Sequence, residues 1–332
     1  MTQGEGTRAG DRRPTSVDVA RRAQVSQSAV SRTFTPGASV SEDTRRRVME
    51  AAEALGYLPN RLPGMLQKDK TGIVSVVAGS LQHPFHTLAL DHIAAALRAA
   101  GKFVNLVRAD DIQDLDSVVG ELVGYRVDAV ITALAVRDPE TAAALDRFGV
   151  PVVRFQSGAP GRCLWTITSD NEDQGRRAAR HLLEVGCRRF AFMAGEGSFN
   201  QDLRRKGFVE TLEAEGHEVR CFVAPGHVYA AGVAGAAQLF EGAPIDGLLC
   251  GNDSVALGVL DEARRRGVRV PDDLKVVGCD NIEQGGWAPY GLTTFDQRTD
   301  RIAAAVVAML DDGMPEDREV FLPMDFIRRD TA

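Results

Sequence analysis

The sequence lacks a long hydrophobic run and paired cysteines. No apolar stretch approaches the roughly 20 residues that span a bilayer, and the first 13 residues hold no hydrophobic segment that would serve as a signal peptide. We therefore expect a cytoplasmic protein with no membrane partner. The five cysteines stand singly, with no C-x-x-C motif and no histidine at metal-binding spacing, so we expect reduced thiols and no bound metal.

Signatures of catalysis are missing too. Gly195 and Gly197 are followed by Asn200, where the dinucleotide-binding motif G-x-G-x-x-G requires a third glycine. No Ser/His/Asp or Cys/His set falls at the ends of the expected strands. We therefore expect a protein that is not an enzyme and needs no cofactor.

The net charge of −7 is unevenly distributed along the 332 residues. Residues 1–70 contain 12 Lys and Arg against 8 Asp and Glu, whereas the remainder contains 27 against 38. A small basic head on an acidic body is typical of a regulator whose DNA contacts are confined to that head. The length allows two or three folded units.

Three short helices are expected near the start of the chain. Thr15 and Asp18 form a capping pair for the first helix, Ser26 caps the second, and the third begins at Ser41 and stops at Gly56. Two short helices joined by a tight turn predict a helix-turn-helix, whose second helix is narrow enough to enter a major groove.

From residue 71 onward, apolar segments of strand length alternate with segments of helical periodicity. This alternation runs through the chain twice, so we expect an α/β core of two lobes, each a doubly wound parallel sheet. We place the first lobe at about 71–168 plus 296–318, and the second at about 169–295 plus 319–332.

The strings V-S-Q-S-A-V-S-R, V-S-E-D-T-R-R-R-V and L-G-Y-L-P-N-R occur in this order within residues 15–66. They resemble the lactose-repressor (LacI-type) family of bacterial transcription regulators, and the match resumes in blocks along the rest of the chain. One departure is Gln24, where the family usually has glycine at a place that tends to need positive φ. The resemblance implies a periplasmic-binding-protein-like core behind the head.

The expected organisation is a disordered tail at 1–13, a helix-turn-helix DNA-binding domain at 14–60, a hinge helix or linker at 61–70, and an effector-binding and dimerisation core at 71–332.

The first positions of the second helix are placed to read bases. Glutamine can pair bidentately with adenine and serine can accept or donate, so we expect Gln27 and Ser28 to read bases; we expect Arg32, one turn further on, to contact guanine or phosphate. In the family the matching positions are the base readers; the alternative is that Gln27 and Ser28 are simply exposed. The residues expected to hold phosphates are Thr15, Ser26, Ser31, Thr33, Ser39 and Asn60. Leu66 matches the leucine that relatives insert into the minor groove, unless the segment is a plain linker.

Effector contacts are expected beyond the carboxyl ends of the strands, where open parallel sheets bind ligands. Asn252 and Asp280 follow expected strands, and Arg204 lies in an R-x-x-G-F string. In the family these three positions contact the effector, commonly through its hydroxyl groups. Phe85 and His86 stand in the string H-P-F-H, where relatives usually read N-P-F-F.

Several of these residues have a second interpretation. A His86 that titrates near pH 6.5 favours an anionic ligand, whereas a surface histidine has no such role. Asp253 is expected to cap the helix that follows it. Phe155, Trp287 and Phe295 are further stacking candidates, each favoured as a core residue.

Together these patterns predict a sequence-specific regulator that binds a double-stranded DNA operator. We expect a homodimeric repressor on a pseudo-palindrome, because one head reads only half of such a site. Its control by a small effector, most simply a sugar or sugar derivative, is a coupling free energy between two sites. Two alternatives stay open: a cytoplasmic small-molecule receptor, and a regulator with a nucleobase or another non-sugar effector.

Overall fold

The computed structural model describes residues 12–35, 37–60, 70–79, 81–109, 115–134, 136, 138–155, 158–195 and 197–332. The chain divides into two compact units, Met1–Asp69 and Lys70–Ala332. Residues 1–11 of the tail expected at 1–13, and residues 61–69 of the hinge expected at 61–70, among them Leu66, lie outside the described residues. None of the helices in the described part of the chain combines the length and apolarity needed to cross a bilayer.

The first unit holds the expected three-helix head. Its helices are α1 (Ser16–Ala23), α2 (Gln27–Thr33) and α3 (Glu42–Leu55). Each helix turns one apolar side inward, and Val19, Val30 and Val48 meet there in a common core.

The capping residues are those that the sequence predicts. The Thr15 hydroxyl and the Asp18 carboxylate form a reciprocal capping box, and Ser26 and Ser41 accept hydrogen bonds from the first turns of α2 and α3. Gln24 ends α1 with a φ of 54°, so the turn has the left-handed conformation that the family usually gives to glycine.

The second unit begins with a six-stranded sheet in which all strands are parallel, in the order β11-β5-β4-β3-β1-β2. Its strands are β1 (Ile73–Ala78), β2 (Phe103–Arg108), β3 (Ala129–Thr132), β4 (Val152–Arg154), β5 (Leu164–Ser169) and β11 (Glu319–Leu322). The helices that cover it are α5 (Pro84–Ala99), α6 (Leu115–Gly124), α7 (Pro139–Phe148) and α12 (Thr299–Asp312).

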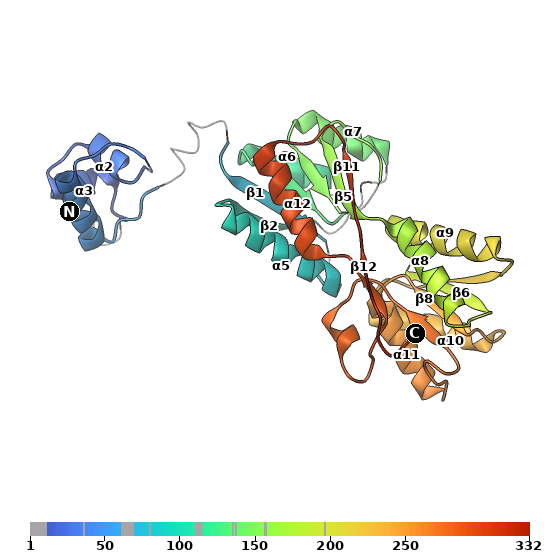
Figure 1. The fold of residues 1–332 in the computed structure, drawn as a ribbon. Coiled ribbons are helices and arrows are strands. Elements are labelled where there is room, and N and C mark those ends of the chain that lie inside the picture. The colour runs from blue at the N-terminus through green and yellow to red at the C-terminus, as the bar shows by residue number, and fades with distance from the viewer. Residues whose placement is uncertain are drawn as a thin grey trace, which may run out of the picture. The chain divides into compact units, whose positions relative to one another are not determined.

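Successive side chains of β1 explain this layering. Val74 and Val76 pack with α5 and α12 on one face, whereas Val77 packs with α6 and α7 on the other (Figure 1). A strand that is apolar on both faces requires helices on both, which is the predicted doubly wound arrangement.

The second lobe repeats this plan with a four-stranded parallel sheet in the order β7-β6-β8-β9. Its strands are β6 (Phe190–Gly195), β7 (Val219–Ala224), β8 (Gly247–Cys250) and β9 (Lys275–Val277). Its helices are α8 (Asn171–Glu184), α9 (Phe199–Ala214), α10 (Tyr229–Glu241), α11 (Asp253–Arg265) and the short 3₁₀ helix η1 (Glu283–Gly286). Phe190 and Phe192 pack with α8 and α9, and Ala191 and Met193 with α10 and α11 (Figure 1).

The last crossing between the lobes comes later than we expected. Glu319–Leu322 was assigned to the second lobe, but as β11 it pairs in parallel with β5 at the edge of the first sheet. The alternating apolar residues of this segment explain the pairing, because Val320 and Leu322 both pack against the core of the first lobe. The chain then enters the second lobe as β12 (Asp325–Ile327), antiparallel to β10 (Thr294–Asp296).

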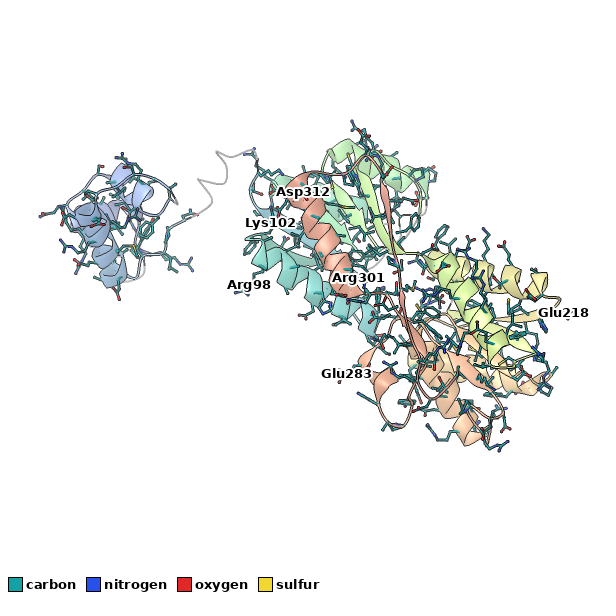
Figure 2. The ribbon with its side chains drawn as sticks, in the orientation of Figure 1. Arg98, Lys102, Glu218, Glu283, Arg301 and Asp312 are labelled. Carbon is teal, nitrogen blue, oxygen red and sulfur yellow. The ribbon has the colours of Figure 1, made fainter. Side chains whose placement is uncertain are left out.

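Most charged side chains of the second unit lie on its surface. Figure 2 labels several exposed ones on helices and loops, among them Arg98, Glu218, Glu283, Arg301 and Asp312.

Candidate functional site

The head presents a polar row along α2. Gln27, Ser28, Ser31 and Arg32 are all exposed. The Gln27 amide donates to the Ser16 hydroxyl at 2.9 Å, and the Arg32 Nε lies 3.4 Å from the Ser28 carbonyl oxygen. Both contacts are local and solvent-exposed, so these side chains are free to exchange them for contacts to DNA.

The expected phosphate contacts divide on burial. Ser26 and Ser39 are exposed, and Thr15 is half-buried in its capping box. Thr33 contradicts our prediction, because it is buried and its hydroxyl donates to the Ala29 carbonyl oxygen at 2.9 Å. A buried hydroxyl that is already bonded to the helix backbone is not placed to meet a phosphate.

Two arginines of α3 have a structural role that the sequence did not reveal. Arg45 donates to the Thr33 carbonyl oxygen at 3.0 Å, and Arg47 donates to the Gln24 carbonyl oxygen at 2.8 Å. Arg47 thereby holds the turn in which Gln24 replaces glycine, and it fixes how α1 and α2 meet.

A cavity of about 370 Å³ lies between the two lobes of the core unit. It is bordered by residues that follow the carboxyl ends of strands in both sheets, including Gly79 after β1, Phe155 after β4 and Gly197 after β6. The five residues predicted to contact an effector all line it: Phe85, His86, Arg204, Asn252 and Asp280.

Asp280 is the acidic side chain among the described residues that line the cavity. It has a φ of 120°, and its side chain is only 3% exposed. Its Oδ1 accepts a hydrogen bond from the Gln297 amide at 2.5 Å, whereas its Oδ2 is buried without a hydrogen-bond partner among the described residues. Burial raises the pKa of Asp280, and the nearby Arg204 charge opposes that rise.

Asp253 does not cap α11, which corrects our prediction. The cap is Asn252, whose Oδ1 accepts from the Val255 backbone N–H at 2.8 Å. Asp253 is fully buried and accepts from the Ile282 backbone N–H at 3.0 Å and from the Thr294 hydroxyl at 2.5 Å. It therefore braces the loop that carries Asp280.

Arg204 is positioned by a close helix contact. Gly175 of α8 and Gly207 of α9 lie where a β-carbon would collide with the backbone of the opposite helix. This contact brings the Arg204 Nε within 2.9 Å of the Asn171 Oδ1, and the guanidinium also donates to the Gly251 carbonyl oxygen. The glycine of the R-x-x-G-F string thus serves to place its arginine.

Two histidines of the cavity, His83 and His86, are neutral at pH 7. Burial lowers the pKa of His83 and of His86 to about 4 in each case. The expectation that His86 titrates near pH 6.5 and attracts an anion is therefore wrong. His86 is not a surface histidine either, because it is half-buried against the cavity and its ring centre is 5.0 Å from that of His83.

The three additional aromatic candidates have different surroundings. Phe155 lines the cavity, whereas Phe295 is buried against Phe326 and Trp287 is 50% exposed beyond η1. Phe155 alone of the three is placed to face a ligand.

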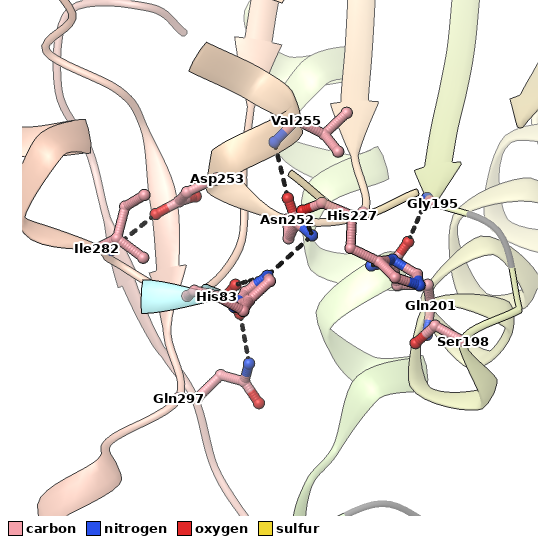
Figure 3. A network of polar contacts seen from close by, with 12 residues as sticks. His83, Gly195, Ser198, Gln201, His227, Asn252, Asp253, Val255, Ile282 and Gln297 are labelled. Carbon is pink, nitrogen blue, oxygen red and sulfur yellow. Dashed lines mark hydrogen bonds and ion pairs between the residues drawn. The ribbon is translucent and has the colours of Figure 1, made fainter. Parts of the chain in front are cut away.

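Our sequence analysis gave no effector role to several polar residues of the cavity, among them His83, Gln201, His227 and Gln297. Gln201 precedes Arg204 by one turn of α9, and His227 follows β7, so helical spacing and the strand-end rule point to both. Gln297 lies between β10 and α12 and has no local signal. Figure 3 shows how these side chains converge around Asn252. The described residues contain no group of three or more His, Cys, Asp or Glu placed to hold a metal ion.

Comparison with known proteins matches both units. Residues 16–60 match the model of bacterial regulatory proteins of the lacI family, and residues 179–332 match a periplasmic binding protein-like domain. The chain is 32% identical to the HTH-type transcriptional regulator CelR of Thermobifida fusca, over 91% of this chain and 92% of that one. It is 29% identical to catabolite control protein A of Priestia megaterium, over 88% and 90% respectively.

Solved structures give the same picture. The lac repressor dimer bound to operator and the anti-inducer ONPF superimposes with a TM-score of 0.86 and 25% identity, over 96% of this chain and 99% of that one. A complex of the transcriptional regulator CelR with cellobiose gives a TM-score of 0.69 and 28% identity, over 96% and 100%.

Proposed function

Because the chain belongs to the LacI family of bacterial regulatory proteins, we propose that it is a homodimeric transcriptional repressor controlled by a neutral carbohydrate. The observation that carries this proposal is the cavity between the lobes, in which an apolar wall faces converging donors and acceptors. Such a cavity suits a ligand with one apolar face and a rim of hydroxyl groups. Under this proposal the protein acts in the cytoplasm as a regulator and not as an enzyme.

The DNA half of the proposal rests on α2. Gln27, Ser28 and Arg32 read base edges in the major groove, while Ser26, Ser31 and neighbouring residues hold phosphates. Two heads are needed for a pseudo-palindromic operator, which is why we propose a dimer. The lac repressor, to which this chain is similar, was solved as a dimer on its operator.

The effector half rests on the chemistry of the cavity. Arg204 and Asp280 carry opposite charges, and His83 and His86 are neutral, so these four groups together do not favour an anion. A carboxylate, an amide and a guanidinium between them donate to and accept from hydroxyl groups. A volume of about 370 Å³ is within the usual range for small-molecule sites. The cellobiose complex of the related CelR supports the carbohydrate class.

The experiment that tests both halves is selection of bound fragments from randomised DNA at near-physiological salt, because low salt inflates non-specific binding. We expect an enriched pseudo-palindrome whose affinity for the protein changes when D-glucose, D-galactose, D-ribose or cellobiose is added. Absence of enrichment by the folded protein, with and without these sugars, contradicts the proposal.

The base-reading role of Gln27 can be tested on the selected sequence. We expect Gln27→Ala to relax preference at one position of each half-site by about 1–3 kcal/mol, because a bidentate base contact is lost. Competition binding with operators substituted at single positions measures this. Ser39→Ala is the matched control, since an exposed phosphate contact affects all sequences equally. A uniform loss of affinity in Gln27→Ala makes Gln27 a phosphate contact instead.

A further inference from the structure

We infer that His83 occupies the place of an effector hydroxyl, and that the effector displaces it by accepting a hydrogen bond from Asn252 and donating one to Asp280. This inference rests on the proposed carbohydrate effector. It concerns a residue to which our sequence analysis gave no effector role. His83 belongs to the first lobe and Asn252 to the second (Figure 3). Asp280, which follows β9, belongs to the second lobe as well.

The orientation of the Asn252 amide is fixed by its neighbours. Its Oδ1 accepts from the Val255 N–H at 2.8 Å, so the amide nitrogen points the other way. That nitrogen lies 3.0 Å from the His227 carbonyl oxygen and 3.1 Å from the His83 Nε2. Reversing the amide would break the helix cap and leave oxygen facing oxygen. Both hydrogens of Asn252 are therefore committed, one of them to His83.

The state of the His83 ring follows from this. Because Nε2 accepts from Asn252, the neutral ring carries its proton on Nδ1. Burial lowers the pKa of His83 to about 4, which is consistent with a neutral ring. The Nδ1 is buried without a hydrogen-bond partner among the described residues. His83 thus makes one good contact across the cavity and leaves its second nitrogen unsatisfied.

Asp280 is left unsatisfied by the same arrangement. Its Oδ2 is 3.7 Å from the His83 Nε2, a nitrogen with no hydrogen to donate, and has no hydrogen-bond partner in the described structure. A protonated His83 would pair with Asp280 but would abandon Asn252. One imidazole nitrogen can serve only one of the two groups. A hydroxyl serves both, because it accepts and donates at once.

His83 is also an unusual residue for its backbone position. It is the N-cap of α5, where Ser, Thr, Asp and Asn are preferred, yet its side chain makes no capping hydrogen bond. The side chain instead reaches across to the other lobe. A serine at this position is therefore expected to preserve α5 while removing the contact with Asn252.

The test is calorimetric titration of the full-length protein and its variants with whichever of D-glucose, D-galactose, D-ribose and cellobiose the wild type binds. We expect His83→Ser to bind that sugar about tenfold more tightly. In the wild type, the state in which His83 fills the hydroxyl site reduces the apparent affinity, and the variant lacks that state. His86→Ser is the matched control from the same turn and is not expected to gain affinity. Weaker or unchanged sugar binding by His83→Ser contradicts the inference that the effector displaces His83.

A second measurement separates this inference from the proposed function. Nitrogen-15 NMR of histidine-labelled, ligand-free protein reports the tautomer of His83, with His83→Ser supplying the assignment. We expect the Nδ1–H tautomer at pH 7; the Nε2–H tautomer or an imidazolium overturns the inference without touching the carbohydrate assignment. If none of the sugars binds, the carbohydrate effector and the replacement fail together, whatever the tautomer.

Discussion

The two lobes of the core share a plan but supply different chemistry to the cavity between them. The second lobe contributes Arg204, Asn252 and Asp280, each held by hydrogen bonds to neighbouring groups of the same lobe or of the crossing segments. The first lobe contributes Phe85 and Phe155 together with neutral histidines. The second lobe thus lines the cavity with charged and amide groups, whereas the first supplies an apolar surface.

The largest effect is expected from the brace beneath the second lobe's polar set. Asp253→Ala leaves the Ile282 N–H and the Thr294 hydroxyl buried without their acceptor, and should reduce the free energy of unfolding by about 3 kcal/mol. Urea denaturation measures the loss. Asp273→Ala, which removes an exposed pair with Arg269, should change stability by less than about 1 kcal/mol. Equal effects would mean that Asp253 braces nothing.

Asp280 should dominate the response to effector. We expect Asp280→Ala to weaken sugar binding by about 1.5–3 kcal/mol, because a hydrogen bond to a charged group is lost. Operator affinity without sugar should stay nearly intact, since the head is a separate compact unit. Calorimetry and DNA-binding titrations measure the two quantities. An unchanged response would remove Asp280 from the effector site.

An apolar contact of the first lobe should matter less. Phe155→Leu keeps the cavity apolar but removes a flat ring, so sugar affinity should fall by about 1 kcal/mol. The loss should be similar for sugars that differ only in the orientation of one hydroxyl. Calorimetric titration with D-glucose and D-galactose checks this, and a loss confined to one sugar would give the first lobe a part in selectivity.

The smallest effect concerns pH. The pKa of Asp280 is raised, so its carboxylate takes up a proton earlier than usual as pH falls, and sugar affinity should weaken modestly from pH 8 to pH 5.5. The pKa values of His83 and His86 are about 4, so both rings stay neutral over this range and add nothing. Titrations of Asp280→Asn should show a weaker pH dependence, with the remainder coming from Asp253, whose pKa burial raises to about 7. Those of His86→Gln should follow the wild type. The reverse pattern would assign the pH dependence to the first lobe.

Local rules predicted what local chemistry determines. The caps at Thr15, Ser26 and Ser41 depend on a few consecutive residues. Asn252 and Asp280 line the cavity as predicted, because both follow the carboxyl ends of parallel strands, and these ends lie along one edge of a sheet.

The misses depend on long-range packing. Thr33 is buried because α2 packs against the other helices of the head. The hydrogen bond between Asn252 and His83 forms only because the two lobes meet. Gln297 reaches Asp280 from a crossing segment whose path depends on both sheets. Strand β11 was misplaced because its four residues suit the edge of either sheet until the partner strand is known.

The position of β11 also has a consequence for synthesis of the chain. Because a ribosome delivers residues in order, β5 leaves it before the whole second lobe, while its neighbour β11 leaves it after. Until then the apolar strand β5 has a bare edge, which is the kind of edge that pairs wrongly with other chains. Helix α12, whose side chains pack with those of β5 in the core of the first lobe, is also synthesised after the second lobe. A nascent chain that ends before residue 299 therefore lacks both α12 and β11, and its first lobe is incomplete. We expect such a chain to depend on chaperones until its last segment is synthesised.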